Sequence, residues 1–325
     1  MIPPLPLSTL ALALFCDAMT GDPDWLYRRV PHPVVMMGRM IGALDRVWNR
    51  PDRSDFARLV RGGFAVVTVM GASGAIGMVT ERLLHQFAYG WIAEAVLISV
   101  LIAQRSLYLH VRHVVAALET GGLAAGRDAV GRIVGRKTER LDESGISRGA
   151  IESLAENFSD GVVAPVFWTA LFGLPGILAY KALNTADSMI GHRSKKYLHF
   201  GRVAARMDDM ANFIPARIAG PLISLAALFM MRTSAANGLR TMLADAKYHR
   251  SVNAGYPEAS MAGALGIRLS GPRQYSDSIA EEPSIGGGRD ALQTDIIVAL
   301  GVFVRACVLL FLLVMAGAVI VGFPV

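Results

Sequence analysis

Three carboxylates recur at four-residue intervals in one segment of the sequence, ESLAENFSDGVVAPVFW. They are Glu152, Glu156 and Asp160. On an α-helix the positions i, i+4 and i+8 lie on one face, so the three side chains are predicted to project together. Carboxylates placed side by side repel one another unless a cation compensates them, and an oxygen-only set of ligands favours magnesium. The segment therefore predicts a magnesium site, with a solvated helix face as the alternative interpretation.

A second segment, YKALNTADSMIGHRSKKY, combines an ammonium group with amide and hydroxyl groups. Lys181, Asn184 and Ser188 share one helical face, and Asp187 lies a turn from Asn184. Such a set is suited to a phosphate, because the ammonium supplies charge while the amide and the hydroxyl orient the group. The alternative interpretation is that Lys181 and the later lysines anchor the chain at a membrane surface.

Two further segments, FGRVAARMDDMANFIPARIAGP and NAGYPEASMAGALGIRLSGP, supply more candidates. The first contains two paired aspartates beside arginines, which suit a metal–phosphate site and equally suit a local ion-pair network. The residues are Arg202, Arg206, Asp208, Asp209, Asn212 and Arg217. The second contains Asn253 and Glu258 among small residues, which permit close approach of a ligand or simply of another helix.

Several familiar solutions are absent from the sequence. It contains no GxxxxGK[ST] phosphate loop, no GxGxxG after a strand and no GxSxG nucleophile, so a bound phosphate must be held by scattered Lys, Arg and Asn side chains. Cys16 and Cys307 have no CxxC spacing and lie in or beside apolar runs. They indicate packing rather than a disulfide scaffold or a zinc site.

His32 stands between two prolines, in a stiff polar setting.

The elements that must position these residues are membrane segments. Apolar residues make up 53% of the 325 residues and charged ones 18%, and the mean hydropathy is +0.42. We therefore predict an all-α, multi-pass helical membrane protein with four to six membrane segments. The candidates are residues 3–15, 62–79, 91–103, 162–179, 214–231 and 296–323. The first lacks a basic n-region and a small-residue cleavage site, so it is interpreted as retained structure.

Glycine and proline interrupt two candidates, 162–179 and 214–231, which predicts broken or re-entrant segments. Lys and Arg outnumber Asp and Glu by 32 to 26, and the excess lies in the connections rather than in one basic patch. The positive-inside bias places the long loops on the cytoplasmic side of the cell membrane, and nothing favours nucleic acid. With no internal repeat or long hydrophilic linker, we predict one membrane-embedded domain, 1–325, with cytoplasmic loops at about 18–58, 105–160, 181–212 and 232–292.

Two of these loops are predicted to be ordered. In the stretch 138–157, Ser144 or Ser147 is expected to cap a helix that continues past Glu152. The glycine- and proline-rich stretch 251–284 is interpreted as an ordered loop laid over other structure, because a flexible loop would have little use for its apolar residues. Those residues are Met261, Leu265, Ile267 and Leu269.

Taken in order after the GDP and PHPV elements, the four long segments closely resemble the adenosylcobinamide-phosphate synthase family of cobalamin biosynthesis. The similarity covers nearly the whole chain; Val252, Phe213 and Lys137 depart from the family's pattern and affect local loop shape. The resemblance implies a membrane enzyme that joins adenosylcobyric acid to aminopropanol, or to its O-phosphate, through a new amide bond, giving adenosylcobinamide (phosphate). It also implies ATP to activate the propionate carboxyl and magnesium to accompany it, without zinc or haem.

The chemistry of amide formation suggests roles for the candidate residues, which the motif match itself does not assign. Glu152, Glu156 and Asp160 are candidate catalytic carboxylates and magnesium ligands, and Asp209 or His32 is a candidate base. Substrate or phosphate binding is expected from Lys181, Asn184, Asp187, Ser188, Arg206, Arg217, Asn253 and Glu258. Expected partners are membrane lipid, the amine-supplying enzyme and a second copy of the chain. The alternative function is a membrane scaffold or transporter for corrinoid intermediates, although charged motifs at the ends of spans favour a site at the membrane surface.

Overall fold

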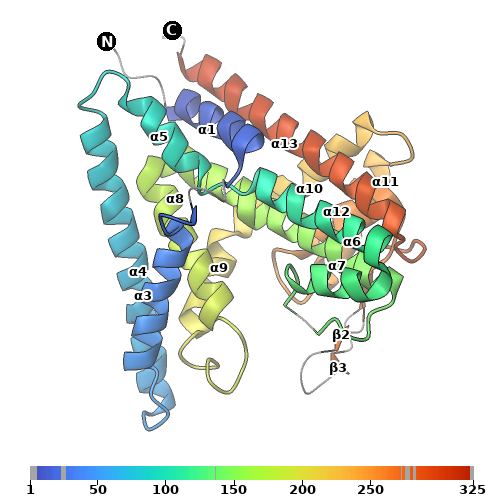
Figure 1. Ribbon diagram of the computed structural model, residues 1–325, viewed down its shortest axis with the longest axis horizontal. Helices are drawn as coiled ribbons and strands as arrows, with labels where there is room; N and C mark the ends of the chain where they lie inside the picture. The colour runs from blue at the N-terminus through green and yellow to red at the C-terminus, as the bar shows by residue number, and fades with distance from the viewer. Residues whose placement is uncertain are drawn as a thin grey trace. The chain divides into compact units, whose positions relative to one another are not determined.

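The computed structural model describes residues 6–22, 27–135, 137–271, 273–274, 279–280 and 283–322 (Figure 1). Regular structure in these residues is almost entirely helical. The four strands have two residues each and form two antiparallel pairs, β1 (Leu269–Ser270) with β4 (Ser284–Ile285) and β2 (Arg273–Gln274) with β3 (Ile279–Ala280). The prediction of an all-α fold is confirmed.

Within the part of the chain that the structure describes, four helical segments are long and apolar enough to cross a membrane. They are Asp55–Leu84, Gly90–Gly131, Glu143–Ile190 and Gln293–Gly322, and the adjoining helices Arg202–Ala211 and Phe213–Phe229 make a fifth if they form one broken span. The N-terminal apolar helix, Leu7–Thr20, is shorter; positions 3–5 of that predicted segment lie outside the described residues. The predicted four to six segments of a multi-pass membrane protein are therefore confirmed.

The predicted interruption of residues 162–179 lies at Gly173, inside helix α8 (Ala164–Ile190), where φ is 62° and ψ is −151°. Glycine reaches this left-handed φ without steric cost, and Pro175 cannot donate the next helical hydrogen bond. Helix α4 (Asp55–Leu84) packs on α8 at this break. A Cβ on Gly77 would come within 2.7 Å of the Pro175 Cα, so only glycine allows the two backbones to approach.

The chain forms two compact units, each assembled from segments that are distant in the sequence. Unit 1 comprises Met1–Ala103, Ala164–Asn212 and Leu313–Val325, and unit 2 comprises Gln104–Val163 and Phe213–Leu312. The single membrane-embedded domain over 1–325 stays a prediction.

Unit 1 is built on helices α1 (Pro6–Thr20), α3 (Pro33–Trp48), α4, α5 (Gly90–Ser99), α8 and α9 (Arg202–Ala211). In Figure 1, α3 and α4 run side by side, and both also contact α8. Their shared apolar core includes Ile41, Val69, Leu183, Ile190 and Phe200. This core fixes the relative positions of α3, α8 and α9, which carry most of the polar candidates of unit 1.

Unit 2 contains α6 (Gln104–Gly131), α7 (Glu143–Phe158), a π-helix η1 (Ser159–Val163), α10 (Phe213–Ala226), the turns η2 (Ala227–Phe229) and η3 (Ala246–Tyr248), α11 (Ala235–Asp245), α12 (Gly255–Leu265) and most of α13 (Gln293–Gly322). Helices α10, α11 and α12 pack on one another. The Phe158 and Phe303 rings meet edge to face, with centroids 5.7 Å apart.

Two local predictions in unit 2 are wrong. Residues 255–265, interpreted as part of a loop, form α12, because alanine and glycine give this helix a thin profile that fits between its neighbours. The expected burial of Met261, Ile267 and Leu269 is confirmed. The cap of α7 is Asp142, which precedes both of the predicted serines. Its carboxylate accepts a hydrogen bond from the Gly145 amide at 2.7 Å.

Candidate functional site

Asp208 is the centre of a buried hydrogen-bonded set in unit 1. Its side chain lies on α9 and is 8% exposed. The Asn184 amide on α8 donates to Asp208 Oδ1 at 3.4 Å, and the Asn212 amide donates to Oδ2 at 2.9 Å. The Tyr180 hydroxyl donates in turn to Asn212 Oδ1 at 2.8 Å. Two neutral amides therefore hold this carboxylate, and no lysine or arginine forms an ion pair with it among the described residues.

The pKa of Asp208 is raised to about 7, chiefly because burial removes water from the carboxylate and next because the charge of Asp187 lies nearby. The hydrogen bonds from the two asparagines oppose this shift. Four of the ten residues of α9, RVAARMDDMA, are charged, so the apolar part of the bent pair is α10 and Asp208 lies before it. A carboxyl group with a pKa near 7 can accept or donate a proton at neutral pH.

Two more carboxylates, those of Asp187 and Asp209, act electrostatically on Asp208. Burial raises the pKa of Asp209, while the charges of Arg206 and Arg193 lower it. The turn after α8 passes close to Asp187, since a Cβ on Gly191 would collide with the Asp187 Oδ1. Acidic groups from α8 and α9 thus gather at one turn, with arginines beside them, and their oxygen atoms are suitable ligands for magnesium.

The predicted phosphate-binding face of α8 is largely engaged within the protein. The Ser188 hydroxyl donates to the Asn184 carbonyl oxygen at 2.9 Å, and the Asn184 amide is held by Asp208. Lys181 is half-buried. The structure thus brings Asn184, Asp187 and Asp209 together around Asp208, the first of the two paired aspartates in the sequence.

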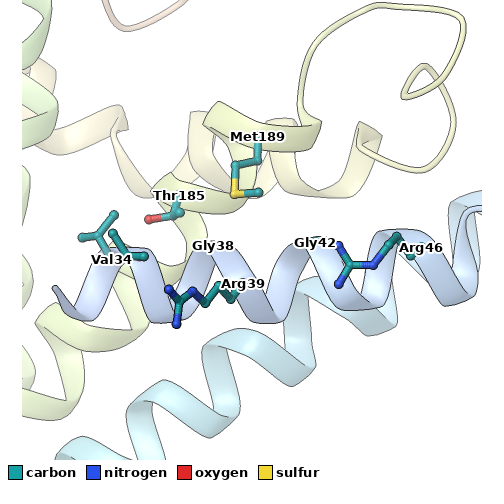
Figure 2. Close-up of a pocket in the computed structure, with 8 residues that line it drawn as sticks. Val34, Gly38, Arg39, Gly42, Arg46, Thr185 and Met189 are labelled. Carbon is teal, nitrogen blue, oxygen red and sulfur yellow. The ribbon is translucent and has the colours of Figure 1, made fainter. Parts of the chain in front are cut away.

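A pocket of about 560 Å³ lies between α3 and α8, and Figure 2 shows its lining. Arg39 and Arg46 contribute guanidinium groups from α3, while Thr185 and Met189 contribute from α8. Both arginines are exposed, and neither makes an ion pair or a side-chain hydrogen bond with the described residues. Two such guanidinium groups beside a hydroxyl suit an anionic ligand.

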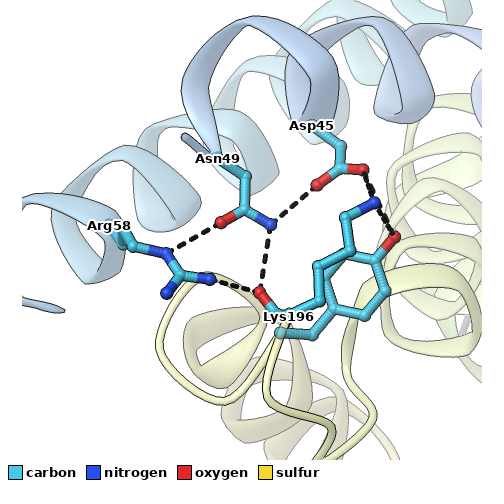
Figure 3. Close-up of polar contacts among 5 residues, drawn as sticks. Asp45, Asn49, Arg58 and Lys196 are labelled. Carbon is cyan, nitrogen blue, oxygen red and sulfur yellow. Dashed lines mark hydrogen bonds and ion pairs between the residues drawn. The ribbon is translucent and has the colours of Figure 1, made fainter. Parts of the chain in front are cut away.

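Lys196 has a different role from membrane anchoring, as Figure 3 shows. Its ammonium group pairs with the buried Asp45 at 2.6 Å, and the Asn49 amide donates to the other carboxylate oxygen at 2.8 Å. Arg58 donates to Asn49 Oδ1 at 2.9 Å, and Tyr197 donates to Asp45. The hydrogen bond to Asp45 raises the pKa of Lys196. This network ties α3, α4 and the connection before α9 together.

His32, a predicted candidate base, caps helix α3. Its Nδ1 accepts a hydrogen bond from the Val34 amide at 3.2 Å, and its Nε2 lies 3.2 Å from the Val100 carbonyl oxygen. Because a carbonyl can only accept, Nε2 must carry the proton, and both ring nitrogens are engaged. In this arrangement His32 has no free lone pair with which to act as a base.

Unit 2 gathers a second acidic set around Ser270, a residue with a left-handed φ of 56°. The Glu152 carboxylate accepts a hydrogen bond from the Ser270 amide at 2.6 Å and has Arg148 at 3.9 Å. Glu258 faces the Ser270 hydroxyl at 3.5 Å and the His249 ring at 3.6 Å. Glu152 is 5% exposed and Glu258 1% exposed, so both carboxylates are buried. They hold a strained strand end in place.

Glu152 and Glu156 share one face of α7 as predicted, but Asp160 does not complete the predicted group of three carboxylates. Helix α7 ends at Phe158, and Asp160 belongs to the π-helix η1, whose wider turn changes the i+4 register that the prediction assumed. Glu156 is exposed, Asp160 is half-buried, and Glu152 is buried. Within the described residues, these three carboxylates do not form a group with ligand atoms within 4.8 Å of one another.

Arg217 and Asn253 meet in unit 2. The Arg217 guanidinium lies 3.4 Å from the centre of the Phe213 ring and 4.2 Å from that of Tyr256, and it donates to Asn253 Oδ1 at 3.4 Å. It also donates to the Phe213 carbonyl oxygen at 2.7 Å. Arg217 therefore joins α10 to the start of α12, with its charge placed over two aromatic faces.

The sequence analysis missed several of these polar residues. Asp208 was predicted as one of two paired aspartates, but neither its burial nor the absence of a paired cation among the described residues could be seen in the sequence. His249 and Ser270 depend on contacts with residues far away in the chain. Arg39 and Arg46 appeared only as part of a basic connection; their seven-residue spacing, which places them on one face of α3, was the signal available.

The fold and these buried polar sets define the chain as a multi-pass helical membrane protein with an acid-rich candidate site in unit 1. The family described as CobD/Cbib protein matches residues 10–303, so the chain belongs to that family, and the predicted family is confirmed.

Similar proteins match over nearly the whole length. A protein of Sinorhizobium sp named cobalamin biosynthesis protein CobD is 52% identical over 318 residues, which cover 97% of this chain and 98% of that protein. Proteins of the same name are 50% identical over 302 residues in Sinorhizobium fredii (strain NBRC 101917 / NGR234), with 92% of each chain covered, and 43% identical over 298 residues in Rhodobacter capsulatus, with 91% and 92% covered. No solved structure matches this chain. The family is thus one of cobalamin biosynthesis.

Proposed function

We propose that this protein is an ATP-dependent carboxylate–amine ligase that joins aminopropanol, or its O-phosphate, to the propionate carboxyl of adenosylcobyric acid. The product is adenosylcobinamide (phosphate). Family membership supports the place in cobalamin biosynthesis. The observation that carries the proposed chemistry is Asp208, a buried carboxyl group with a pKa raised to about 7 and no paired cation.

Amide formation from an alkyl ammonium and a carboxylate needs two changes. The nitrogen must lose a proton before it can attack, and the carboxylate needs a leaving group better than oxide, which ATP with magnesium supplies. Asp208 is suited to the first task, because a base with a pKa near the working pH is ionised often enough to accept the proton. Asn184 and Asn212 fix the orientation of its carboxylate.

Two carboxylates near Asp208 are the proposed ligands of a magnesium ion. A bound phosphate and water would complete its shell, because Asp187, Asp208 and Asp209 do not all have ligand atoms within 4.8 Å of one another. Asp187 makes no side-chain hydrogen bond with the described residues, although it lies close to other acidic charges. Asp187 and Asp209 would hold the ion, because hard oxygen atoms are the ligands that magnesium prefers. Arg206 and Arg193 stand beside Asp209 and would offset phosphate charge.

The pocket between α3 and α8 is the proposed place for an anionic group of a substrate. Arg39 and Arg46 would hold the phosphate of aminopropanol phosphate or of the nucleotide, and Thr185 would donate its hydroxyl. Val34 and Met189 give the pocket an apolar part beside these polar groups.

We place this site on the cytoplasmic side of the cell membrane, where ATP is available. The connection between α8 and α9 carries Arg193, Lys195 and Lys196, in keeping with the positive-inside rule. A single cysteine introduced at the exposed Ser188, with Cys16 and Cys307 replaced by serine, should react with a membrane-impermeant maleimide only in inverted vesicles. Reaction in intact cells would contradict this orientation.

The proposed reaction can be tested with the purified protein in detergent. Adenosylcobyric acid, magnesium-ATP and either aminopropanol or aminopropanol phosphate are supplied separately, and the amidated corrinoid is detected by mass. Product that depends on ATP supports the ligase. No product from either amine, with the corrinoid still bound, would instead support the scaffold or transporter function. Co-purification of the amine-supplying enzyme, and the mass of the complex in detergent, test the expected partner and self-association.

Matched variants connect the activity with the site. Asp208→Asn keeps the size of the side chain and removes the base, whereas Asp52→Asn makes the same change at an exposed position of unit 1. The proposal requires that the first variant lose product formation while it remains folded and that the second retain it. Equal activity of both variants would remove Asp208 from the mechanism.

A further inference from the structure

A third group of ionisable side chains lies in unit 1, where α4 ends and α5 begins. Glu81 and His85 are one turn apart at the end of α4, and Glu94 projects from α5. One carboxylate oxygen from each glutamate and one ring nitrogen of His85 all lie within 4.8 Å of one another. No other group of three potential ligand residues in the described part of the chain meets this spacing.

The group is not explained by an ordinary ion pair. His85 Nε2 lies 2.8 Å from Glu94 Oε2, and this one contact engages the imidazole. Glu81 then faces Glu94 with like charge, and its carboxylate makes no hydrogen bond or ion pair with any described residue. Glu94 is 5% exposed, and His85 is its sole side-chain partner among the described residues. A buried carboxylate and a facing, unpaired one call for a compensating cation.

The surrounding backbone leaves room for this arrangement. Gly173, at the break in α8, lies against Glu81, since a Cβ there would come within 2.6 Å of Glu81 Oε1. Helix α5 packs on both α4 and α8, so the two ends of the α4–α5 hairpin are held while the three ligand atoms converge.

We infer that Glu81, His85 and Glu94 bind a divalent first-row transition metal ion, of which Zn²⁺ is the test case. Two carboxylates and a neutral imidazole carry two negative charges, which a divalent ion neutralises. Such an ion bonds nitrogen and oxygen at about 2.0–2.2 Å, which puts tetrahedral ligand atoms about 3.4 Å apart. The three atoms, which lie within 4.8 Å of one another, are already near that spacing. The imidazole favours Zn²⁺ over Mg²⁺ or Ca²⁺.

The ion would stabilise the hairpin and is separate from the proposed ligase site. The expectation that zinc is absent rested on two isolated cysteines and on the family resemblance. The proposed site uses no cysteine, and its third ligand, Glu94, lies on α5 rather than on α4, so a short sequence motif could not reveal it.

Metal binding by the full-length protein tests this inference. The protein is purified in detergent with a histidine-free tag, stripped with a chelator and dialysed against buffered Zn²⁺, and bound metal is measured by mass spectrometry. We expect about one ion per chain, and a rise in Tm when Zn²⁺ is added. Three variants each remove one ligand. His85→Gln changes an exposed side chain and Glu81→Gln a half-buried one, so both should fold, and Glu94→Gln keeps the size and shape of the buried side chain.

Each of these variants should weaken Zn²⁺ binding by more than the roughly 10- to 100-fold that loss of an outer-shell partner costs. The matched control is His199→Gln. It removes another histidine of unit 1 that lies beside a carboxylate, since His199 Nε2 is 3.4 Å from Asp55 Oδ1. It should bind Zn²⁺ like the wild type. The inference is overturned if the wild type binds no stoichiometric Zn²⁺, or if the His85 and Glu81 variants bind as well as the His199 control.

Discussion

Asp208 in unit 1 and Glu258 in unit 2 are both buried carboxylates, but their surroundings differ. Asp208 is held by the amides of Asn184 and Asn212, and the charges nearest to it are those of other aspartates. Glu258 faces His249 and the hydroxyl of Ser270. In unit 1 burial and the charge of Asp187 raise the pKa of the Asp208 carboxyl to about 7, whereas in unit 2 His249 and Ser270 provide polar partners for the Glu258 carboxyl.

This difference separates a site suited to proton transfer from one suited to holding the backbone. One carboxylate oxygen of Glu152 accepts the hydrogen bond of the Ser270 amide. Ser270 has a left-handed conformation, which its surroundings must stabilise. Asp208 supports no backbone group in this way. A buried acid without a cation is costly to stability, and such costs are commonly found at functional sites.

The largest expected effect is on catalysis by the Asp208→Asn variant. Because it removes the proposed base, kcat should fall by on the order of 100- to 1,000-fold, with a smaller change in KM. Steady-state formation of the amidated corrinoid measures both. Glu258→Gln is the counterpart in unit 2 and should retain most of its kcat once the folded fraction is accounted for. A folded Glu258→Gln protein that is as inactive as Asp208→Asn would end the distinction between the two units.

Next in size is the effect of Glu152→Ala on stability. The substitution leaves the buried Ser270 amide without its acceptor, at a cost of about 1–3 kcal/mol. Thermal unfolding in detergent should show the loss, and Glu152→Gln should recover much of it because an amide oxygen can still accept. If alanine and glutamine variants are equally stable, the hydrogen bond to Ser270 is not what Glu152 contributes.

The pH dependence of stability should distinguish Asp208 from an ordinary surface acid. Folding raises its pKa from 3.8 to about 7, so the folded state binds the proton more tightly than the unfolded state does. This contribution is fully present below about pH 4 and is lost as the pH rises through about 7. The Tm of wild type relative to Asp208→Asn should therefore fall between pH 5 and pH 8. A constant difference would mean that Asp208 is ionised throughout.

The smallest effect is expected at Lys196, a structural ion pair of unit 1 outside the proposed site. Lys196→Met removes the partner of Asp45, but the lysine side chain is 58% exposed, and Asn49 and Tyr197 still donate to the carboxylate. We expect a loss of about 1 kcal/mol or less, with kcat unchanged. A drop in kcat at full stability would extend the functional site of unit 1 to this network.

Hydropathy was sufficient to predict the long helices of this protein. The segment 296–323 corresponds to Gln293–Gly322, and 62–79 lies within Asp55–Leu84, because some 20 apolar residues in a row have few other stable environments. The break at Gly173 was also predictable from its glycine and proline residues. The helix α12 was not, because its alanine and glycine residues favour a helix only when close neighbours bury it.

The pairing of the polar side chains was beyond the reach of the sequence. Glu152 meets Ser270 across 118 positions, and Asp45 meets Lys196 across 151. Sequence spacing favoured Glu152, Glu156 and Asp160 as a group, but a π-helix changed the register at Asp160.

The sequence by itself determined that this is a membrane protein, that it is helical and which family it belongs to. These properties follow from composition, from the length of the apolar runs and from long motifs in a fixed order along the chain. Tertiary structure alone decided which acids are buried and what faces them. The adjacent residues Asp208 and Asp209 have the same chemistry and differ by about 100° around one helix. Because α9 packs on α8, that rotation leaves Asp209 half-buried beside arginines and places Asp208 between two amides.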